Sequence, residues 1–155
     1  VVAPPDPGID LNVEAYIPDE YIPDAQQKVE MYKKVAAIRT DEEAAELEEE
    51  MVDRFGDPPP AVSNLLSIAR LKVHARIIGL GQIVQERDGV ALRFLPGLTV
   101  PREVPLHLMR RFRGQIAVLP GRNTAIKVRS RGLTDAQLLA LLYDVVVETE
   151  KHWAH

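Results

Sequence analysis

Residues 40–56, TDEEAAELEEEMVDRFG, have the pattern of an amphipathic helix with well-marked ends, and the rest of the chain can be placed around this helix. Thr40 followed by Glu43 fits a capping box, in which each side chain binds a free backbone amide at the helix start. Gly56 stands where the chain needs a residue that tolerates positive φ to leave the helix. Apolar residues recur at steps of three or four and predict one buried stripe: Ala44, Leu47, Met51 and Phe55.

The other faces of this helix carry a high density of acid. Eight carboxylates fall within thirteen residues: Asp41, Glu42, Glu43, Glu46, Glu48, Glu49, Glu50 and Asp53. Acids in the first turn suit the helix dipole, whereas Glu50 and Asp53, near the end, oppose it. One interpretation is an ordinary solvated face. The other is an electronegative docking surface for a basic partner, with Glu46, Glu49, Glu50 and Asp53 as the candidate partner-binding residues.

The chain before this helix begins with a proline-rich stretch, residues 1–10, which we expect to be a linker or N-terminal arm. The absence of an initiator methionine suggests a piece of a longer polypeptide. Residues 11–17 alternate apolar and polar side chains and predict a strand. IPDEYIPD, residues 17–24, predicts a rigid turn. Asp24 then caps a helix over residues 25–38, whose expected buried stripe is Val29, Tyr32, Val35 and Ala36.

The chain after the acidic helix predicts two hairpins and three helices. Pro58 suits the first turn of a third helix that ends at Gly79. Its expected apolar face is Val62, Leu65, Leu66, Ala69, Val73 and Ile77. Residues 80–86 and 90–95 form one predicted hairpin, and residues 115–119 and 124–130 form another. A short helix over 102–112 separates them, and a capping box at Thr134 and Gln137 opens a last helix. The order predicts an α+β fold with an antiparallel sheet, as a single domain over residues 11–155.

Composition bounds the possible functions. The chain has no cysteine, which excludes disulfides and thiolate zinc sites. No run approaches the length of a membrane span, so we expect no membrane partner and an intracellular location. Residues 1–60 hold 16 acidic and 5 basic residues, while residues 61–155 hold 7 acidic and 14 basic ones. This asymmetry favours charged docking over bulk nucleic-acid binding.

The sequence contains no constellation typical of catalysis. It lacks a P-loop, an HExxH motif and a GxSxG elbow. The four histidines, His74, His107, His152 and His155, show no metal-site spacing, so we predict no metal and no cofactor. An alternative function is a nucleic-acid-binding accessory domain, because eight cations crowd thirty residues of the second half: Arg102, Arg110, Arg111, Arg113, Arg122, Lys127, Arg129 and Arg131. Stacking aromatics are scarce there, which weighs against it.

Several motifs resemble one known family. IPDEYIPD from Ile17, Tyr32-Lys33, VDRFGDPP from Val52 and LLSIARLK from Leu65 are similar to the C-terminal domain of bacterial transcription-repair coupling factors. The likeness runs over about residues 11–149, and its specific motifs lie in the first half. The resemblance implies a parent that is a cytoplasmic, ATP-driven DNA translocase. Such a parent displaces stalled RNA polymerase from damaged DNA and recruits the excision-repair protein UvrA.

The resemblance also implies a role for the domain itself. The family's C-terminal domain is non-catalytic, packs on the parent's UvrA-binding module, and restrains the motor until polymerase is engaged. Glu50 and Asp53 match the acidic positions that pair with arginines of that module. The implied partners are therefore this intramolecular module and, for the parent, RNA polymerase, UvrA and DNA. We expect the isolated domain to be a monomer.

Overall fold

The computed structural model describes residues 5–119 and 121–153, and its backbone contacts divide into two compact units. One unit, the helical unit, comprises Val13–Val73. The other, the sheet unit, combines the chain up to Asn12 with the chain from His74 onward. Each has its own buried side chains. No helix in the described ranges is long and apolar enough to cross a membrane.

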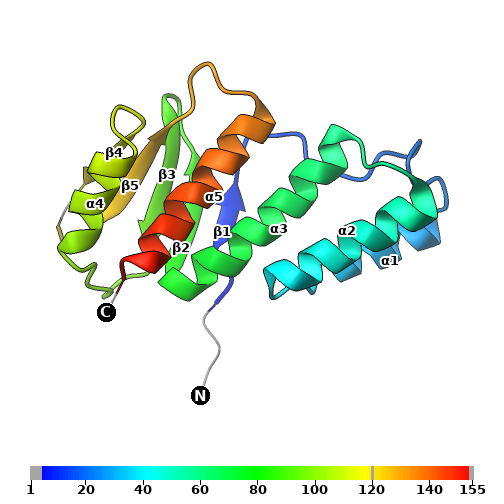
Figure 1. Cartoon of the computed structure of the whole chain (residues 1–155), viewed down its shortest axis with the longest axis horizontal. Coiled ribbons are helices and arrows are strands. Elements are labelled where there is room, and N and C mark those ends of the chain that lie inside the picture. The colour runs from blue at the N-terminus through cyan, green and yellow to red at the C-terminus, as the bar shows by residue number, and fades with distance from the viewer. Residues whose placement is uncertain (1–4, 120, 154–155) are drawn as a thin grey trace. The chain divides into compact units, whose positions relative to one another are not determined.

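The helical unit holds α1 (Ala25–Ala36), α2 (Asp41–Phe55) and most of α3 (Pro60–Ile78), drawn in cyan to green in Figure 1. The predicted stripe of α2 is confirmed, because Ala44, Leu47 and Met51 are buried and Phe55 packs against the same core. Thr40 caps the helix by accepting a hydrogen bond from the Glu43 amide. The Glu43 carboxylate accepts from the Arg39 amide, at 2.7 Å, rather than from Thr40 as predicted.

The buried stripe predicted for α1 was largely wrong. Met31 and Val35 face the core, whereas Val29 is 53% exposed and Tyr32 is 37% exposed. Tyr32 instead accepts a hydrogen bond from the Ile17 amide through its hydroxyl, at 2.8 Å. The polar tip of Tyr32 therefore binds the backbone of the preceding segment instead of packing in the core. The prediction counted Tyr32 as apolar, and so it placed the buried face about one residue away from its position in the structure.

The IPDEYIPD turn packs into the helical unit at its two isoleucines, Ile17 and Ile22, which are fully buried. Between them, Tyr21 donates from its hydroxyl toward Gly56 O at 2.7 Å and Met51 O at 3.2 Å. Met51 lies in the last turns of α2, and Gly56 is the C-cap residue, whose carbonyl has no helical amide after it. The turn thus closes the end of the acidic helix.

The predicted strand over residues 11–17 was also wrong. Backbone groups there bind the start of α3, since Tyr16 N donates to Ala61 O and Asn64 Nδ2 donates to Glu14 O. The N-terminal strand of the fold is β1 (Gly8–Asp10), within the stretch expected to be an arm. It pairs in parallel with β2, so the sheet is mixed. The alternating pattern therefore reflects one-sided packing on a helix rather than a sheet ladder.

The sheet unit contains five strands in the order β1-β2-β3-β5-β4. The hairpin strands are β2 (Leu80–Gln85), β3 (Gly89–Phe94), β4 (Ile116–Leu119) and β5 (Ala125–Arg129). Both predicted hairpins are antiparallel, and the α+β prediction is confirmed. Helix α4 (Glu103–Arg111) precedes β4, and α5 (Asp135–Lys151) runs along the strands in Figure 1. The capping box at Thr134 and Gln137 is present.

Candidate docking face on the acidic helix

The outer face of α2 is a stripe of carboxylates. A helix advances about 100° per residue, which places four acids within about 60° of one another and opposite the buried stripe. They are Glu42, Glu46, Glu49 and Asp53, and all four are exposed. In the described part of the chain, none of them forms an ion pair. We call these four residues the acidic stripe; it includes three of the four residues predicted from sequence.

Glu50, the fourth predicted residue, lies beside the stripe and is already engaged. Its Oε2 accepts from Lys34 Nζ and from Arg54 Nη1, each at 2.8 Å. The hydrogen bond from Lys34, and then the one from Arg54, hold the pKa of Glu50 below its ordinary value. One third of the side chain remains exposed, so a partner's cation can still reach it, but only in competition with two internal cations.

The acids on the flanks of α2 serve the helical unit itself. Glu48 pairs with Arg70 of α3 at 3.1 Å, and Glu43 takes part in the N-terminal cap. The carboxylates nearest the core therefore bind groups of the same unit, while those farthest from the core are exposed to solvent. This division within one helix concentrates unmatched negative charge on a single outward face.

A shallow groove of about 230 Å³ runs between α1 and α2 beside the stripe. Glu46 and Glu50 line it on one side and Lys34 on the other, with Ile38 and Leu47 forming its apolar floor. An aliphatic stem ending in a cation fits such a lining, because the methylenes contact the floor and the head meets the carboxylates. Sequence reasoning missed this groove, since it depends on how α1 packs against α2.

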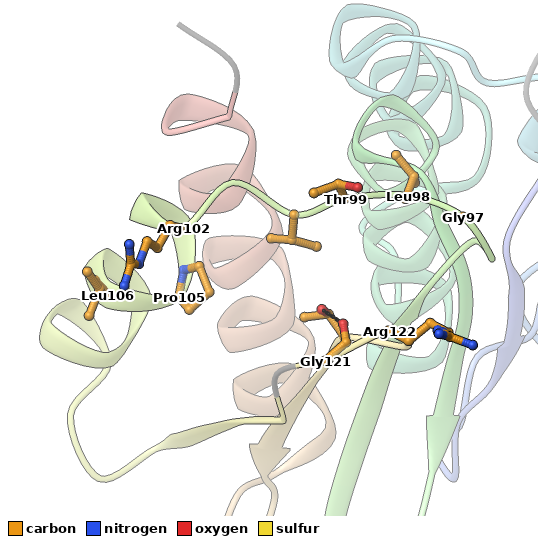
Figure 2. A pocket seen from close by; sticks show the side chains of 10 residues that line it. Gly97, Leu98, Thr99, Arg102, Pro105, Leu106, Gly121 and Arg122 are labelled. Atoms are coloured by element: carbon orange, nitrogen blue, oxygen red, sulfur yellow. Dashed lines mark hydrogen bonds between the residues drawn. The ribbon is translucent and has the colours of Figure 1, made fainter.

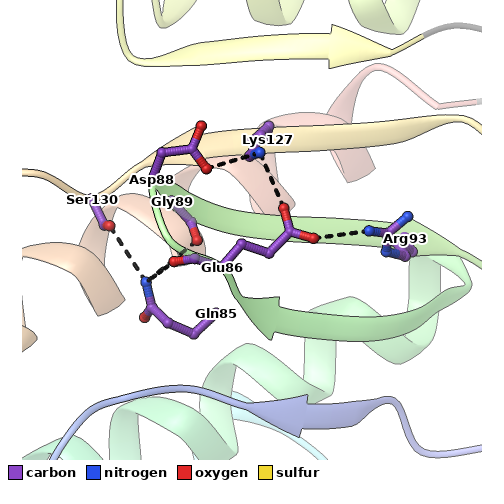
Figure 3. Close-up of polar contacts among 7 residues, drawn as sticks. All are labelled: Gln85, Glu86, Asp88, Gly89, Arg93, Lys127 and Ser130. Carbon is purple, nitrogen blue, oxygen red and sulfur yellow. Dashed lines mark hydrogen bonds and ion pairs between the residues drawn. The ribbon is translucent and has the colours of Figure 1, made fainter.

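The basic second half is partly neutralised within the sheet unit. Lys127 Nζ lies 3.1 Å from Glu86 and 2.9 Å from Asp88, and Arg93 pairs with Glu86 at 3.0 Å (Figure 3). Hydrogen bonds from Lys127 lower the pKa of both carboxyls, and the Asp88 carboxylate, followed by Glu86, raises the pKa of Lys127. The charge of Lys127 is therefore neutralised by carboxylates of the same unit.

Other cations of the second half are exposed without an ion pair among the described residues: Arg102, Arg110, Arg113, Arg122 and Arg131. Two of them, Arg102 and Arg122, border a cavity of about 620 Å³ beside α4, with Leu98, Pro105 and Leu106 on its walls (Figure 2). This rim is positive and its walls are apolar.

Comparison with known protein families matches residues 11–103 to the TRCF domain. The chain is 45% identical over 84 residues to the transcription-repair-coupling factor of Bacillus subtilis, and 37% identical over 95 residues to that of Staphylococcus epidermidis. These stretches cover 54% and 61% of this chain but only 7% and 8% of the relatives. The chain therefore corresponds to a small part of much longer proteins.

A solved structure shows the same fold. The C-terminal domain of a transcription-repair coupling factor superposes with a TM-score of 0.86, over 97% of this chain and 95% of that chain, at 21% sequence identity. The fold similarity thus extends past residue 103, where the family match ends. The resemblance expected from IPDEYIPD and VDRFGDPP is confirmed, and the chain belongs to the TRCF domain family.

Proposed function

We propose that residues 11–155 act as the non-catalytic regulatory domain of a transcription-repair coupling factor. In this proposal the domain masks the parent's UvrA-binding module and restrains its DNA-translocating motor until RNA polymerase is engaged. The parent's relatives carry the name transcription-repair-coupling factor, which supports a role in transcription-coupled DNA repair. The mask itself is our inference from the sequence resemblance and from the charge of α2.

The observation that carries this proposal is the acidic stripe. Four exposed carboxylates lie on the side of α2 opposite its core, and the helical unit supplies no cation to them among the described residues. A mask must be complementary to another surface and must also be releasable. A charged, hydrated interface suits both demands, because it gives specificity and orientation without a large apolar contact.

We assign the roles within the face as follows. Glu49 and Asp53, together with Glu46, present unmatched charge to arginines of the UvrA-binding module. Glu50 contributes at the groove, where an incoming arginine can share its carboxylate with Lys34. Each close pair is worth about 1.5–7 kcal/mol of coupling if it becomes desolvated and much less at a solvated rim.

Titration of the domain against the separately expressed UvrA-binding module tests the proposal. We expect binding that weakens as salt is raised and that is abolished by Glu49→Lys with Asp53→Lys. The matched control is Glu103→Lys with Asp144→Lys, two exposed acids outside the helical unit. Equal loss in both double variants would point to net charge rather than to the acidic stripe.

A second form of the experiment covers weak docking. The two modules are joined in one chain, and access of UvrA to its module is measured. If UvrA binds the joined chain as tightly as the free module, and reversal of the stripe changes nothing, the masking role is wrong.

The exposed arginines of the sheet unit favour a second candidate, direct binding of nucleic acid. Arg102, Arg110 and Arg122 have no ion pair among the described residues, and phosphates are bound by such surfaces. This function predicts affinity for duplex DNA that falls steeply with salt and is reduced by Arg110→Gln with Arg122→Gln. The absence of a mobility shift at low salt would eliminate it.

A further inference from the structure

Two histidines and a glutamate, carried by α4 and by the C-terminal end of α5, converge in the sheet unit. His107 lies on α4, Glu148 lies in the last turns of α5, and His152 caps the C-terminal end of α5. His107 Nε2 is 2.8 Å from Glu148 Oε2, and His152 Nε2 is 3.6 Å from the same oxygen. One ligand-type atom from each residue lies within 4.8 Å of the other two. Three groups of metal-ligating type therefore share one small volume.

The fold places His107 and Glu148 on regular helices and His152 directly after the last residue of α5. Glu148 and His152 are four residues apart, which places them on one side of the α5 terminus. His107 is flanked by the buried Val104 and Leu108 on its own helix, while the buried Val145 and Thr149 hold α5 beside it. α4 and α5 are in contact. Sites carried on packed helices keep their geometry better than sites on loops.

The spacing fits a zinc-like ion. A tetrahedral site with metal–ligand bonds of about 2.0–2.1 Å has ligand atoms about 3.3 Å apart. The two nitrogen–oxygen separations, 2.8 and 3.6 Å, lie on either side of that value, and all three ligand atoms lie within 4.8 Å of one another. Two imidazoles and one carboxylate form a donor set that holds zinc with a fourth position left for water. Small rotations of the side chains bring all three into range.

Hydrogen bonding alone explains only part of this arrangement. His107 and His152 stack with ring centroids 3.5 Å apart, so both rings turn Nε2 toward a single carboxylate oxygen. Lys151 Nζ approaches the other oxygen at 3.5 Å, but its side chain is 63% exposed and can withdraw into solvent. Metal binding requires the ring nitrogens that face the ion to be deprotonated. In that state, an ion between the rings and the carboxylate would bind all three ligand atoms.

We propose that His107, Glu148 and His152 form a binding site for a divalent transition-metal ion of the zinc class, which ties α4 to the C-terminal end of α5. Nothing in the linear spacing of the histidines predicts this site, because His107 joins it only through the packing of α4 on α5. The site lies in the sheet unit and does not depend on the proposed docking function.

Metal titration of the chelator-treated chain of residues 1–155 tests this site. Zn²⁺ is measured by competition with a chromophoric chelator, Co²⁺ by its visible absorption, and Mg²⁺ serves as a hard-ion control. We expect one equivalent of Zn²⁺, a tetrahedral Co²⁺ spectrum and no comparable binding of Mg²⁺. Loss of an outer-shell partner weakens metal sites about 10–100-fold, so His107→Gln or His152→Gln should weaken zinc binding by at least about 100-fold.

Controls separate the cluster from a terminal histidine and from misfolding. His155→Ala should leave binding unchanged. Glu148→Gln keeps the shape of the side chain and should also weaken binding, while circular dichroism verifies that each variant is folded. Zinc should raise the melting temperature of the wild-type chain and of His155→Ala, but not of the cluster variants.

Zinc binding that survives His107→Gln and His152→Gln, or that disappears in His155→Ala, would overturn the proposal. A wild-type chain that binds neither Zn²⁺ nor Co²⁺ would overturn it without any variant.

Discussion

Lys34 Nζ and Arg54 Nη1 both lie 2.8 Å from Glu50 Oε2, so the carboxylate expected to take part in docking is already held by two cations of its own unit. Glu50 therefore has a structural task besides any partner contact. A variant at this position changes folding and docking together, whereas the acidic stripe can be altered with less effect on the fold.

Glu50→Gln is expected to lower the free energy of unfolding by about 0.2–1 kcal/mol at neutral pH, the range of solvent-exposed ion pairs. The effect should depend on pH. Because the pKa of Glu50 is depressed in the folded state, its contribution is full above the ordinary glutamate pKa and disappears as pH falls through the lower folded value. Urea denaturation of both proteins between pH 7 and pH 3 measures this. A difference as large at pH 3 as at pH 7 would contradict the ion-pair explanation.

Tyr21→Phe is expected to destabilise the helical unit by about 1 kcal/mol. The substitution removes the hydroxyl that donates toward Gly56 O and Met51 O, and it keeps the ring that contacts Phe55 at a centroid distance of 5.9 Å. Chemical denaturation supplies the measurement. The matched control is Tyr16→Phe on an exposed ring, which should have little effect on stability.

Gly89→Ala tests a close approach between two backbones in the sheet unit. A Cβ at this position would lie 2.3 Å from Val128 O, on the neighbouring strand β5. Gly89 and Val128 both lie in the paired strands β3 and β5, so relief requires moving a strand, and we expect a loss of about 1–3 kcal/mol. Gly97→Ala is a poor control, because its φ is 86°. Gln82→Ala, on an exposed position of β2, is suitable. An unchanged melting temperature in Gly89→Ala would refute this account.

Local signals in the sequence predicted the elements whose ends and faces are set by nearby residues. The caps at Asp24, Thr40 and Thr134 are present, and both hairpins formed near the predicted residues. The α2 stripe followed directly from its spacing. In each case the decisive contacts lie within a few residues of one another.

Features set by contacts between distant parts of the chain escaped prediction. β1 is three residues long and pairs with a strand more than seventy residues away, so no hairpin signal marks it. The internal ion pair between Lys34 and Glu50 requires the packing of α1 on α2. The cluster of His107, Glu148 and His152 likewise requires α4 beside α5. The periodicity of apolar residues shows which face of a helix or strand is buried, but not which other element of the fold packs against that face.

Asp53→Lys should separate stability from function on the acidic stripe. Asp53 lies in the last turn of α2, where the helix dipole disfavours a carboxylate, and Glu49 stands one turn before it as a like charge. Replacing this acid by a cation is expected to raise the free energy of unfolding by about 0.3–1 kcal/mol. The same change should weaken docking to the UvrA-binding module.

A variant that gains stability but loses docking affinity distinguishes a functional carboxylate from one that is merely solvated. Denaturation and docking titrations are made on the same preparations of Asp53→Lys, Asp53→Asn and the control Asp144→Lys. If the residue is kept for docking, Asp53→Lys gains stability and loses affinity, with Asp53→Asn between it and the wild type. A gain in stability with unchanged affinity would mean that the carboxylate at the end of α2 belongs to a solvated surface and that the docking face lies elsewhere.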